Sequence, residues 1–324
     1  MTDHARFHPA WWCRGAHMQT LWPVFIRRKP KVPLKRERLE LPDGDFLDLD
    51  WTSNSTSGPI VVILHGLEGS SDSQYARGML NALVHRGWRG MVMHFRGCGG
   101  ESNRLTRSYH SGETGDIGYV LKLLHEREPD TPIAAIGYSL GGNVLLKYLG
   151  ENGRNTPLRA SAAVSVPMLL GECALRLESG FSRVYQWHLV RSMRGSAETK
   201  RRRIEMPIKI DDLSRLHTFR EWDNAITAPL HGFAGVDDYY DKSSSRQYLQ
   251  GIAVPTLLIH AKNDPFMTQR VIPSKQELSP AISFELYETG GHVGFVSGQW
   301  PWQASYWLEH RIPVFLCKNL GCED

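Results

Sequence analysis

The expected fold is decided by residues 133–142, which read IAAIGYSLGG. The first four are apolar, as in a strand buried on both faces of a sheet, and apolar residues at helical spacing follow up to residue 149. Between strand and helix stands Gly-X-Ser-X-Gly, which in this context predicts a sharp turn that presents the Ser139 hydroxyl. Gly137 and Gly141 leave room for that turn. We therefore expect Ser139 to act as a nucleophile, with a helix-capping turn as the structural alternative.

Strands and helices alternate on both sides of this turn. Further strands are expected at residues 60–64, 88–95, 160–166, 255–260 and 282–287, and helices at 74–86, 116–126, 142–149 and 302–309. A β-hairpin is expected before them, because two alternating runs between Arg38 and Trp51 flank Asp43 and Gly44. This order implies right-handed strand–helix–strand crossovers and an α/β fold, with a mostly parallel central sheet flanked by helices.

One long segment interrupts the alternation. Between residues 166 and 254 the sequence is rich in Arg and Trp, with helix-like and irregular stretches and no strand pattern. We expect residues 167–253 to form a largely helical lid or cap over one end of the sheet. The core then comprises residues 37–166 and 254–324. Residues 1–36, rich in aromatics and Pro, are expected to wrap the surface of that core.

A serine hydroxyl becomes a good nucleophile only when a base accepts its proton and an acid orients that base. Asp264 is the candidate acid, because it follows the strand expected at 255–260 and lies in a turn fixed by Pro265. Asp237 and Asp238 are rivals by sequence order, but no strand precedes them. A turn or capping aspartate is the structural alternative for Asp264.

The candidate base is one of 14 histidines in the chain. His292 follows the last expected strand and a double glycine, which places it at the same sheet edge as Ser139. His260 lies inside a strand pattern and is expected to be packed in the core.

The negative charge of a tetrahedral intermediate requires preorganised hydrogen-bond donors. One candidate is the backbone N–H of Leu140, directly after the nucleophile. The other is the Leu67 N–H in the loop after residues 60–64, where Gly66 lets the backbone approach a substrate. His65, the first residue of that loop, is expected to fix it by hydrogen bonding rather than to react.

The composition of the chain argues against several classes of protein. The 324 residues are 41% hydrophobic and 22% charged, as in globular proteins, and the net charge of +4 is far from a nucleic-acid-binding signature. The longest apolar run, residues 60–64, is much shorter than the roughly 20 residues of a membrane span. Neither a signal peptide nor a transmembrane anchor is expected, and five cysteines without a CxxC pair suggest neither disulfides nor zinc. We expect a cytoplasmic protein.

Several other groups have competing interpretations. The basic clusters at 27–38 and 200–203 are expected to be solvated surface, or to contact anionic lipid headgroups weakly. The aromatic residues Trp11, Trp12, Trp22 and Phe25 indicate packing, with an interfacial anchor as the alternative. Arg96, His110 and Glu113 are expected to form a structural polar network, with shaping of the substrate entrance as the alternative. Cys98 lies on a glycine-rich loop away from the serine turn and is not expected to be a nucleophile.

With these residues in order, the chain resembles the α/β-hydrolase superfamily, and within it the YheT-like branch of bacterial hydrolases and animal and plant α/β-hydrolase-domain lipases. The matching motifs are GAHMQTLWP (15–23), HGLEG (65–69), HFRGCGGE (94–101), YHSGET (109–114), GYSLGGN (137–143), NDPF (263–266) and GGHVGF (290–295). The resemblance implies triad roles for Ser139, Asp264 and His292 and hydrolysis of carboxylic esters, with some relatives acting on acylglycerols or phospholipids. Animal relatives carry an N-terminal membrane anchor, and none is expected in this sequence, so soluble or micellar esters are the expected substrates.

The expected function is therefore a serine carboxylic ester hydrolase, carboxylesterase-like or lipase-like, that forms an acyl-enzyme on small to medium acyl esters. No metal or organic cofactor is expected, and the oligomeric state stays open. An acyltransferase with the same triad is one alternative, because the outcome depends on whether the lid excludes water. A lipase acting on acylglycerols or phospholipids at an interface is the other. A binding protein on a retired hydrolase fold would lack a triad member, and none is missing.

Overall fold

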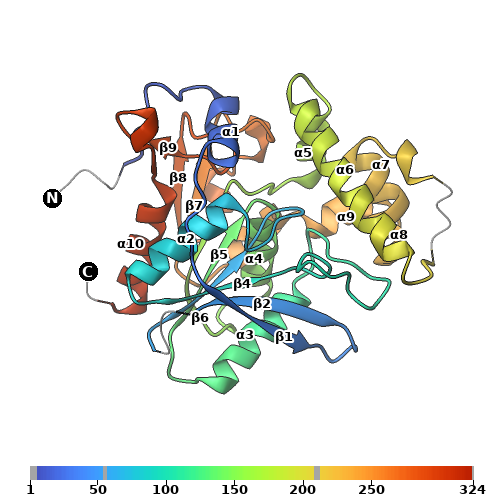
Figure 1. Ribbon diagram of the computed structural model, residues 1–324, viewed down its shortest axis with the longest axis horizontal. Helices are drawn as coiled ribbons and strands as arrows, with labels where there is room; N and C mark the ends of the chain where they lie inside the picture. Colours follow the sequence, from blue (N-terminus) through green and yellow to red (C-terminus); the bar gives the residue numbers. More distant parts are fainter. Residues whose placement is uncertain (1–5, 54–56, 208–211, 323–324) are drawn as a thin grey trace.

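The computed structural model describes residues 6–53, 57–207 and 212–322 (Figure 1). The expected N-terminal segment, core and lid include residues 1–5, 54–56, 208–211 and 323–324, which lie outside the described residues. Within it, strands and helices follow the alternation expected from the sequence, and the fold is α/β.

The centre of the molecule is an eight-stranded sheet in the order β1-β2-β4-β3-β5-β6-β7-β8. Its strands are β1 (Leu34–Glu40), β2 (Phe46–Thr52), β3 (Ile60–Leu64), β4 (Arg89–Met93), β5 (Ile133–Tyr138), β6 (Leu158–Val164), β7 (Thr256–Ala261) and β8 (Ile282–Tyr287). The hairpin of β1 and β2 is antiparallel, and β2 pairs antiparallel with β4. From β4 to β8 every pairing is parallel, so the carboxyl ends of these strands share one edge.

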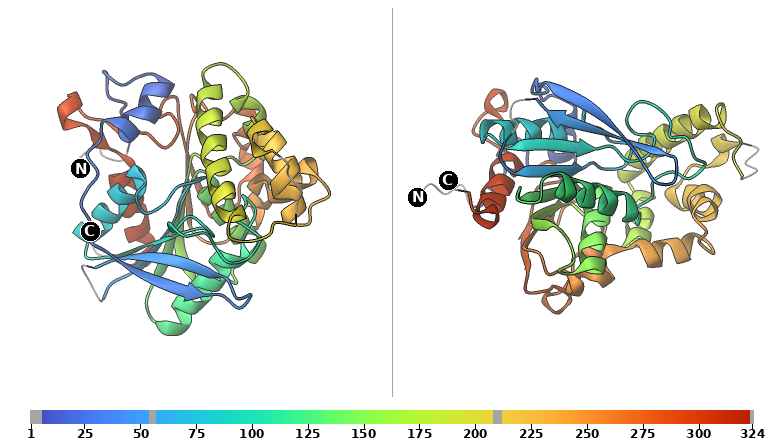
Figure 2. Two further views of the ribbon diagram at one scale, coloured as in Figure 1. Left: turned by 45° about the vertical axis from the view of Figure 1, so that its right-hand side comes forward. Right: turned by 90° about the horizontal axis from the view of Figure 1, so that it is seen from below.

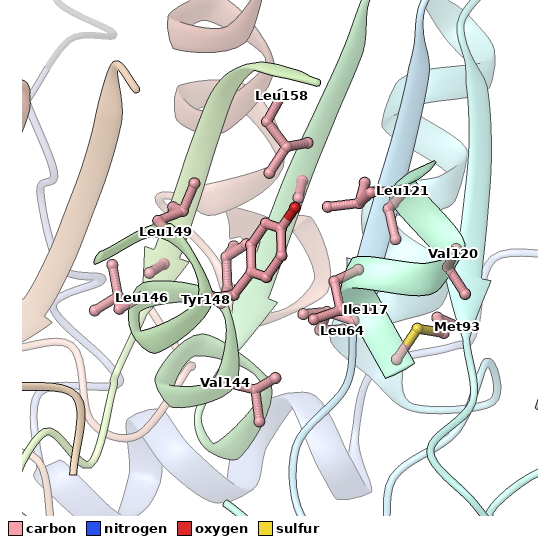
Figure 3. Close-up of a cluster of buried hydrophobic side chains, with 14 of the residues drawn as sticks. Leu64, Met93, Ile117, Val120, Leu121, Val144, Leu146, Tyr148, Leu149 and Leu158 are labelled. Carbon is pink, nitrogen blue, oxygen red and sulfur yellow. The ribbon is translucent and has the colours of Figure 1, made fainter. Parts of the chain in front are cut away.

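Helices cover both faces of the sheet because successive strand residues point to opposite sides. On one face, Val62 and Leu64 of β3 pack in a cluster with α3 (Gly115–Arg127) and α4 (Leu140–Asn152), shown in Figure 3. On the other face, Val61 and Ile63 pack with α2 (Gln74–His85) and α10 (Leu308–Leu320). Strands β3, β4, β5 and β7 are buried along their whole length, which explains the unbroken apolar sequence of β3, whereas β8 at the sheet edge is only partly buried.

The segment between β6 and β7, which we call the helical insertion (residues 167–253), projects from the sheet in both views of Figure 2. Its helices are α5 (Leu170–Leu177), α6 (Ser182–Arg201), α7 (Phe219–Trp222), α8 (Ala228–Leu230) and α9 (Val236–Ser243), with a π-helical turn at Asp223–Thr227. Its described residues form no strand. It has two small apolar clusters of its own, one of which includes Leu67 from the loop after β3.

Two parts of the sequence interpretation were wrong. The last helix is α10, at Leu308–Leu320, whereas residues 302–309 were expected; Pro301–Gln303 is only a short 3-10 turn. Pro313 inside α10 obscured the helical pattern, but Leu308, Ile312 and Leu316 recur every four residues and pack in the core. The wrapping segment also contains an unexpected helix, α1 (Ala16–Phe25), with Pro23 inside it.

Strand ends differ by a few residues from the expected ones. β4 ends at Met93, two residues before the expected end, and β6 begins at Leu158, two residues before the expected start, because Leu158 already pairs with Ile133 of β5. No helix among the described residues has both the length and the apolar character needed to cross a lipid bilayer.

The turn between β5 and α4 leaves no room for a side chain at its two glycines. A Cβ atom on Gly141 would overlap the carbonyl oxygens of Leu64 and His65, and one on Gly137 would overlap the backbone of Gly142. These neighbours are main-chain atoms, which cannot move aside as a flexible side chain can. The two glycines therefore let α4 start directly against the end of β3.

We predict that Gly141→Ala lowers the free energy of unfolding by about 2–3 kcal/mol, because the new methyl group must displace backbone. Gly195→Ala is the matched control: Gly195 lies within α6 and has nothing within 4 Å of its would-be Cβ. That change should raise stability by about 0.5–1 kcal/mol through helix propensity. Urea unfolding of both variants tests this account, and equal stability of Gly141→Ala and wild type would contradict it.

Candidate active site

Ser139 lies at the strained turn that joins β5 to α4. Its φ and ψ angles are 51° and −118°, a conformation that costs energy for a residue with a side chain. The turn is held by the Ser139 N–H, which donates to the Val164 carbonyl oxygen at 2.9 Å. Ser139 therefore stands at the carboxyl edge of the sheet, beside the N-terminus of α4.

The structure brings His292 and Asp264 to Ser139 from two other loops of the same edge. His292 Nε2 lies 3.0 Å from Ser139 Oγ, and His292 Nδ1 lies 2.9 Å from Asp264 Oδ2. Because a carboxylate only accepts, Nδ1 carries the proton and Nε2 presents its lone pair to the serine hydroxyl. Asp264 is only 3% exposed, and its other oxygen accepts the Phe266 N–H at 2.8 Å.

His292 is held by contacts from three directions. Its backbone N–H donates to Thr20 Oγ1 of α1 at 2.9 Å, and the Gly291 N–H donates to Asn263 Oδ1 at 3.0 Å. The ring of Phe266 stacks on the imidazole with centroids 4.0 Å apart and planes 1° apart. The orientation of the imidazole is thereby fixed before any substrate arrives.

Thr20 is a site residue that the sequence reasoning missed. It lies in the stretch GAHMQTLWP, which matched the family resemblance but carried no assigned role. The available signal was a polar Gln19-Thr20 pair inside an aromatic segment, and both residues are buried in the structure. Gln19 bonds the backbone of Val296, so α1 is built into the segment that carries His292.

The loop after β3 passes directly over Ser139. A Cβ on Gly66 would lie 3.5 Å from Ser139 Cβ, so this loop and the serine are in contact. Among the described residues, neither the Leu67 N–H nor the Leu140 N–H has a hydrogen-bond acceptor. Two unpaired amides beside one hydroxyl are the arrangement that an oxyanion requires.

His65 fixes this loop, as expected from the sequence. Its Nε2 accepts the Phe95 N–H at 3.1 Å, so its Nδ1 carries the proton and donates to the Gly66 carbonyl oxygen at 2.7 Å. Burial lowers the pKa of His65 to about 3, which keeps the ring neutral and both bonds intact.

Glu68 connects the same loop to the helical insertion. Its N–H donates to the Tyr109 hydroxyl at 2.9 Å, and that hydroxyl donates to Glu68 Oε1 at 2.8 Å. Glu68 Oε2 accepts from Ser192 and Ser196 of α6 at 3.1 and 2.7 Å. Glu68 also has a positive φ of 52°, directly after Leu67. The Glu68 carboxylate therefore holds the Leu67 peptide in a fixed position relative to α6.

A cavity of about 1480 Å³ separates Ser139 from the helical insertion. Its wall includes Leu67 and Tyr109 from the core and Leu170, Met193 and Trp222 from the insertion. It exceeds the roughly 300–1,000 Å³ of an ordinary small-molecule pocket. The chamber can hold a substrate much larger than the ester group itself.

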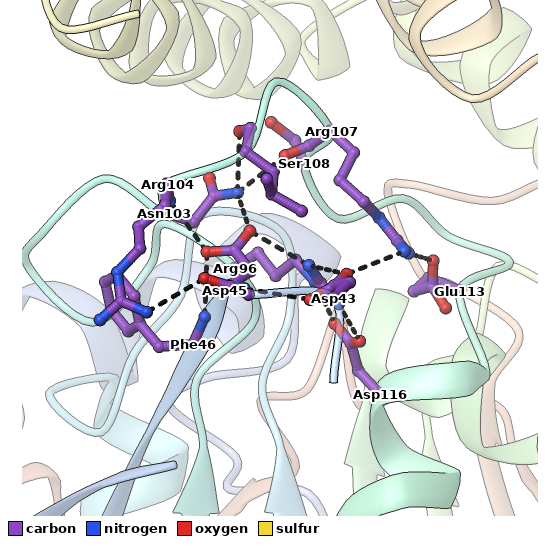
Figure 4. Close-up of polar contacts among 12 residues, drawn as sticks. Asp43, Asp45, Phe46, Arg96, Asn103, Arg104, Arg107, Ser108, Glu113 and Asp116 are labelled. Atoms are coloured by element: carbon purple, nitrogen blue, oxygen red, sulfur yellow. Dashed lines mark hydrogen bonds and ion pairs between the residues drawn. The ribbon is translucent and has the colours of Figure 1, made fainter. Parts of the chain in front are cut away.

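Arg96 forms a buried polar network at the cavity wall (Figure 4), and the expected partners Glu113 and His110 join it indirectly. Its guanidinium pairs with Asp116 at 2.7 and 2.8 Å and with Asp43 and Asp45 at 2.8 and 3.1 Å. Arg107 bridges Asp43 and Glu113, and His110 Nε2 lies 3.9 Å from Glu113 Oε2 while its ring contacts that of His231. The carboxylate partners of Arg96 come from the β1–β2 turn and α3, so the network holds the hairpin to the core.

Two basic residues expected on the solvated surface make internal contacts instead. Lys200 at the end of α6 is 5% exposed, and its Nζ donates to Asn103, Ser108 and the Arg107 carbonyl oxygen at 2.6–3.1 Å. Burial lowers its pKa to about 8. Arg27 pairs with Glu309 at 2.8 Å. The contacts of Lys200 anchor the helical insertion, and the Arg27–Glu309 pair joins the segment after α1 to α10.

The rival residues lie elsewhere. Asp237 is on the exposed side of α9 and pairs with Arg220, whereas His260 is buried in β7 with its pKa lowered by burial. Burial raises the pKa of the Cys98 thiol, so it stays protonated. Among the described residues, no group of three or more His, Cys, Asp or Glu side chains is placed to hold a metal ion.

Comparisons with known proteins bear on the family and fold of the chain. The model of the family described as "alpha/beta hydrolase fold" matches residues 59–299. YheT of Escherichia coli (strain K12), whose name marks it as a candidate esterase, is 45% identical over 100% of this chain and 96% of its own length. The phospholipase ABHD3 of Mus musculus is 32% identical over 93% of this chain and 75% of its own length. The esterase Pf2001 of Pyrococcus furiosus has the same fold, with a TM-score of 0.61 at 18% identity over 90% and 92% of the two chains.

The Glu68 contacts generate a kinetic prediction. Glu68→Gln keeps the size of the side chain but cannot accept from Tyr109 and α6 together, so the Leu67 peptide should lose its fixed position. We expect kcat for ester hydrolysis to fall about tenfold with KM changed less than about threefold, since a lost oxyanion donor costs 10²–10³. Glu198→Gln is the control, because Glu198 also lies on α6 and forms an ion pair with Arg201 on the same helix. An unchanged kcat, or a change confined to KM, would contradict the assignment.

Asp223 in the π-helical turn generates a prediction for stability. Its oxygens accept from Thr227 and Tyr240 at 2.7 and 2.9 Å, and no cation among the described residues pairs with it. Burial raises its pKa from 3.8 to about 6. The folded state therefore holds the proton more tightly than the unfolded state, and its stability falls as pH rises from about 4 to 6.

Asp223→Asn removes this titration. The variant should gain about 2 kcal/mol relative to wild type between pH 4.5 and pH 8, because each pKa unit corresponds to about 1.4 kcal/mol and part of the effect is already present at pH 4.5. Thermal and urea unfolding at both pH values measure the difference, with the exposed Asp241→Asn as control. A stability difference that is the same at both pH values would contradict the buried carboxyl assignment.

Proposed function

This chain belongs to the α/β-hydrolase family and to its YheT-like branch, and from that membership we propose that it is a serine carboxylic ester hydrolase. Its relatives include proteins named as esterases and phospholipases, and hydrolase activity is common to those names. The finer assignment, a Ser139 nucleophile with His292 and Asp264 on carboxylic esters, is our proposal. The observation that carries it is the continuous hydrogen-bonded series from Asp264 through His292 to Ser139.

In the first half of the reaction, Ser139 Oγ attacks the ester carbonyl carbon while His292 Nε2 takes the hydroxyl proton. Asp264 stabilises the imidazolium that forms. The negative charge moves to the carbonyl oxygen, where the N–H groups of Leu67 and Leu140 donate to it. Collapse of this intermediate expels the alcohol, which takes the proton from His292, and leaves the acyl group on Ser139.

In the second half, His292 removes a proton from water, and the hydroxide attacks the acyl-enzyme at the same carbonyl carbon. The same two N–H groups hold the second oxyanion, and the acid leaves as Ser139 recovers its proton from His292. Every proton in this scheme passes through Nε2, which the hydrogen bond at Nδ1 leaves free to accept.

The size of the cavity supports a second candidate within the same chemistry, a lipase acting on acylglycerols or phospholipids. The chamber of about 1480 Å³ is larger than small acyl esters need, and its wall is mostly apolar side chains from core and insertion. The 32%-identical relative named as a phospholipase points in the same direction. Chain-length preference distinguishes this candidate from a small-ester carboxylesterase.

The proposal predicts the outcome of a p-nitrophenyl ester series from acetate to palmitate. Ser139→Ala should reduce kcat by at least about 10³ on every ester, because the attacking atom is gone. Ser53→Ala, at the exposed end of β2, is the matched control and should keep full activity. A rate maximum at short chains indicates a carboxylesterase, and one at long chains above the micellar threshold indicates the lipase. Intact turnover in Ser139→Ala would refute the mechanism.

A further inference from the structure

Most of the large exposed apolar side chains come from the two segments around α1 and around α5 and α6, both of which also contribute to the cavity wall. Eight of the twelve such side chains in the described part of the chain lie there: Met18, Val24, Phe25, Ile26, Leu175, Phe181, Val184 and Trp187. They come from α1 and its C-terminal end, and from α5 and α6. We call these eight residues the apolar rim. The remaining four are Trp11, Trp300, Trp302 and Val314.

The two parts of the rim are neighbours in space. His17 Nδ1 of α1 lies 3.0 Å from the Tyr185 hydroxyl of α6, and the His17 ring lies 4.5 Å from that of Phe181. Figure 1 and the left view of Figure 2 show α1 and α5 on the same upper side of the molecule. Phe25 and Trp187 also belong to the cavity wall, so the rim is continuous with the chamber that leads to Ser139.

The sequence around the rim is strongly basic. Segments 14–31 and 175–191 together hold eight Lys or Arg residues and a single acidic residue, Glu178. One of the eight, Arg27, forms an ion pair with Glu309 of α10 and is largely covered. Arg28, Lys29, Arg183 and Arg191 are exposed beside the apolar side chains. An apolar surface bordered by cations matches a lipid leaflet with anionic headgroups.

We propose that the apolar rim docks this protein onto an anionic membrane surface, with the cavity entrance facing the lipid. Phe25 and Trp187 enter the acyl boundary while the surrounding cations contact phosphate groups. An ester lipid then passes from the leaflet into the cavity without crossing water. The identity of that ester rests on the proposed function, but docking itself does not require turnover.

A second copy of this chain is a poorer occupant of the rim. A two-fold symmetric contact pairs a surface with itself, so it would bring two strongly basic faces together. A lipid surface meets the same residues with opposite charge. Electrostatic attraction of this kind weakens with salt because exposed charges are screened beyond roughly 8–10 Å.

Vesicle co-sedimentation of Ser139→Ala protein tests the docking. This variant cannot digest the lipid by the proposed mechanism, and a failure of the proposed function would leave the binding result valid. The probe is phosphatidylcholine vesicles with or without about 30% phosphatidylglycerol. The test variant adds Phe25→Ser and Trp187→Ser, at side chains 75% and 54% exposed. The control adds Trp302→Ser, which is 77% exposed and outside the cavity wall.

We expect the test variant to lose at least about tenfold in partition coefficient on anionic vesicles, while the Trp302→Ser control keeps its binding. Arg28→Gln with Lys29→Gln should weaken binding to anionic vesicles only, as should raising salt from about 0.1 M to about 0.5 M. Unchanged thermal unfolding shows that each variant is folded.

Three outcomes would overturn the proposal. The first is no binding of Ser139→Ala protein to anionic vesicles, and the second is an equal loss in the rim and Trp302→Ser variants. The third is a dimer in sedimentation velocity that the rim substitutions dissociate, which would give the rim to a second copy of the chain.

Discussion

The structure depends on one backbone constraint, the left-handed turn at Ser139 between β5 and α4. The turn is possible because Gly137 and Gly141 carry no side chain where the backbone of β3 and α4 meets. Close contact there has two results at once. It raises the serine hydroxyl above the sheet edge, and it brings the loop with Leu67 against it. The packing of the surrounding sheet and helices keeps Ser139 in this strained backbone conformation.

The other half of the site is assembled by segments far apart in the chain. His292 is oriented by Asp264 through its ring, by Thr20 of α1 through its backbone, and by Phe266 through stacking. The Leu67 loop is tied to α6 through Glu68. The N-terminal helix and the helical insertion therefore contribute to the geometry of the site as well as to its enclosure. Both also present apolar side chains at its entrance, so site geometry and surface docking share the same two elements.

The sequence predicted much of the fold because buried parallel strands have unbroken apolar runs and turns have glycine. The residues predicted for the site, from Ser139 to His292, come together because each follows a strand, and strand ends share one edge. The features that could not be predicted from the sequence depend on packing between segments that are distant in the chain. Pro313 concealed α10, and no local pattern shows that Thr20 meets His292 or that Lys200 is buried against Asn103. Such contacts are visible only once the chain has folded.

The central claim is that Ser139 is the activated nucleophile, and covalent labelling tests it most directly. A fluorophosphonate reacts with a serine only when a base has activated its hydroxyl. Treating folded protein with the probe and mapping the adduct by mass spectrometry should show one modified residue, Ser139, with no labelling of Ser139→Ala or of urea-unfolded protein. An adduct on another residue, or no adduct on folded protein, would contradict the account.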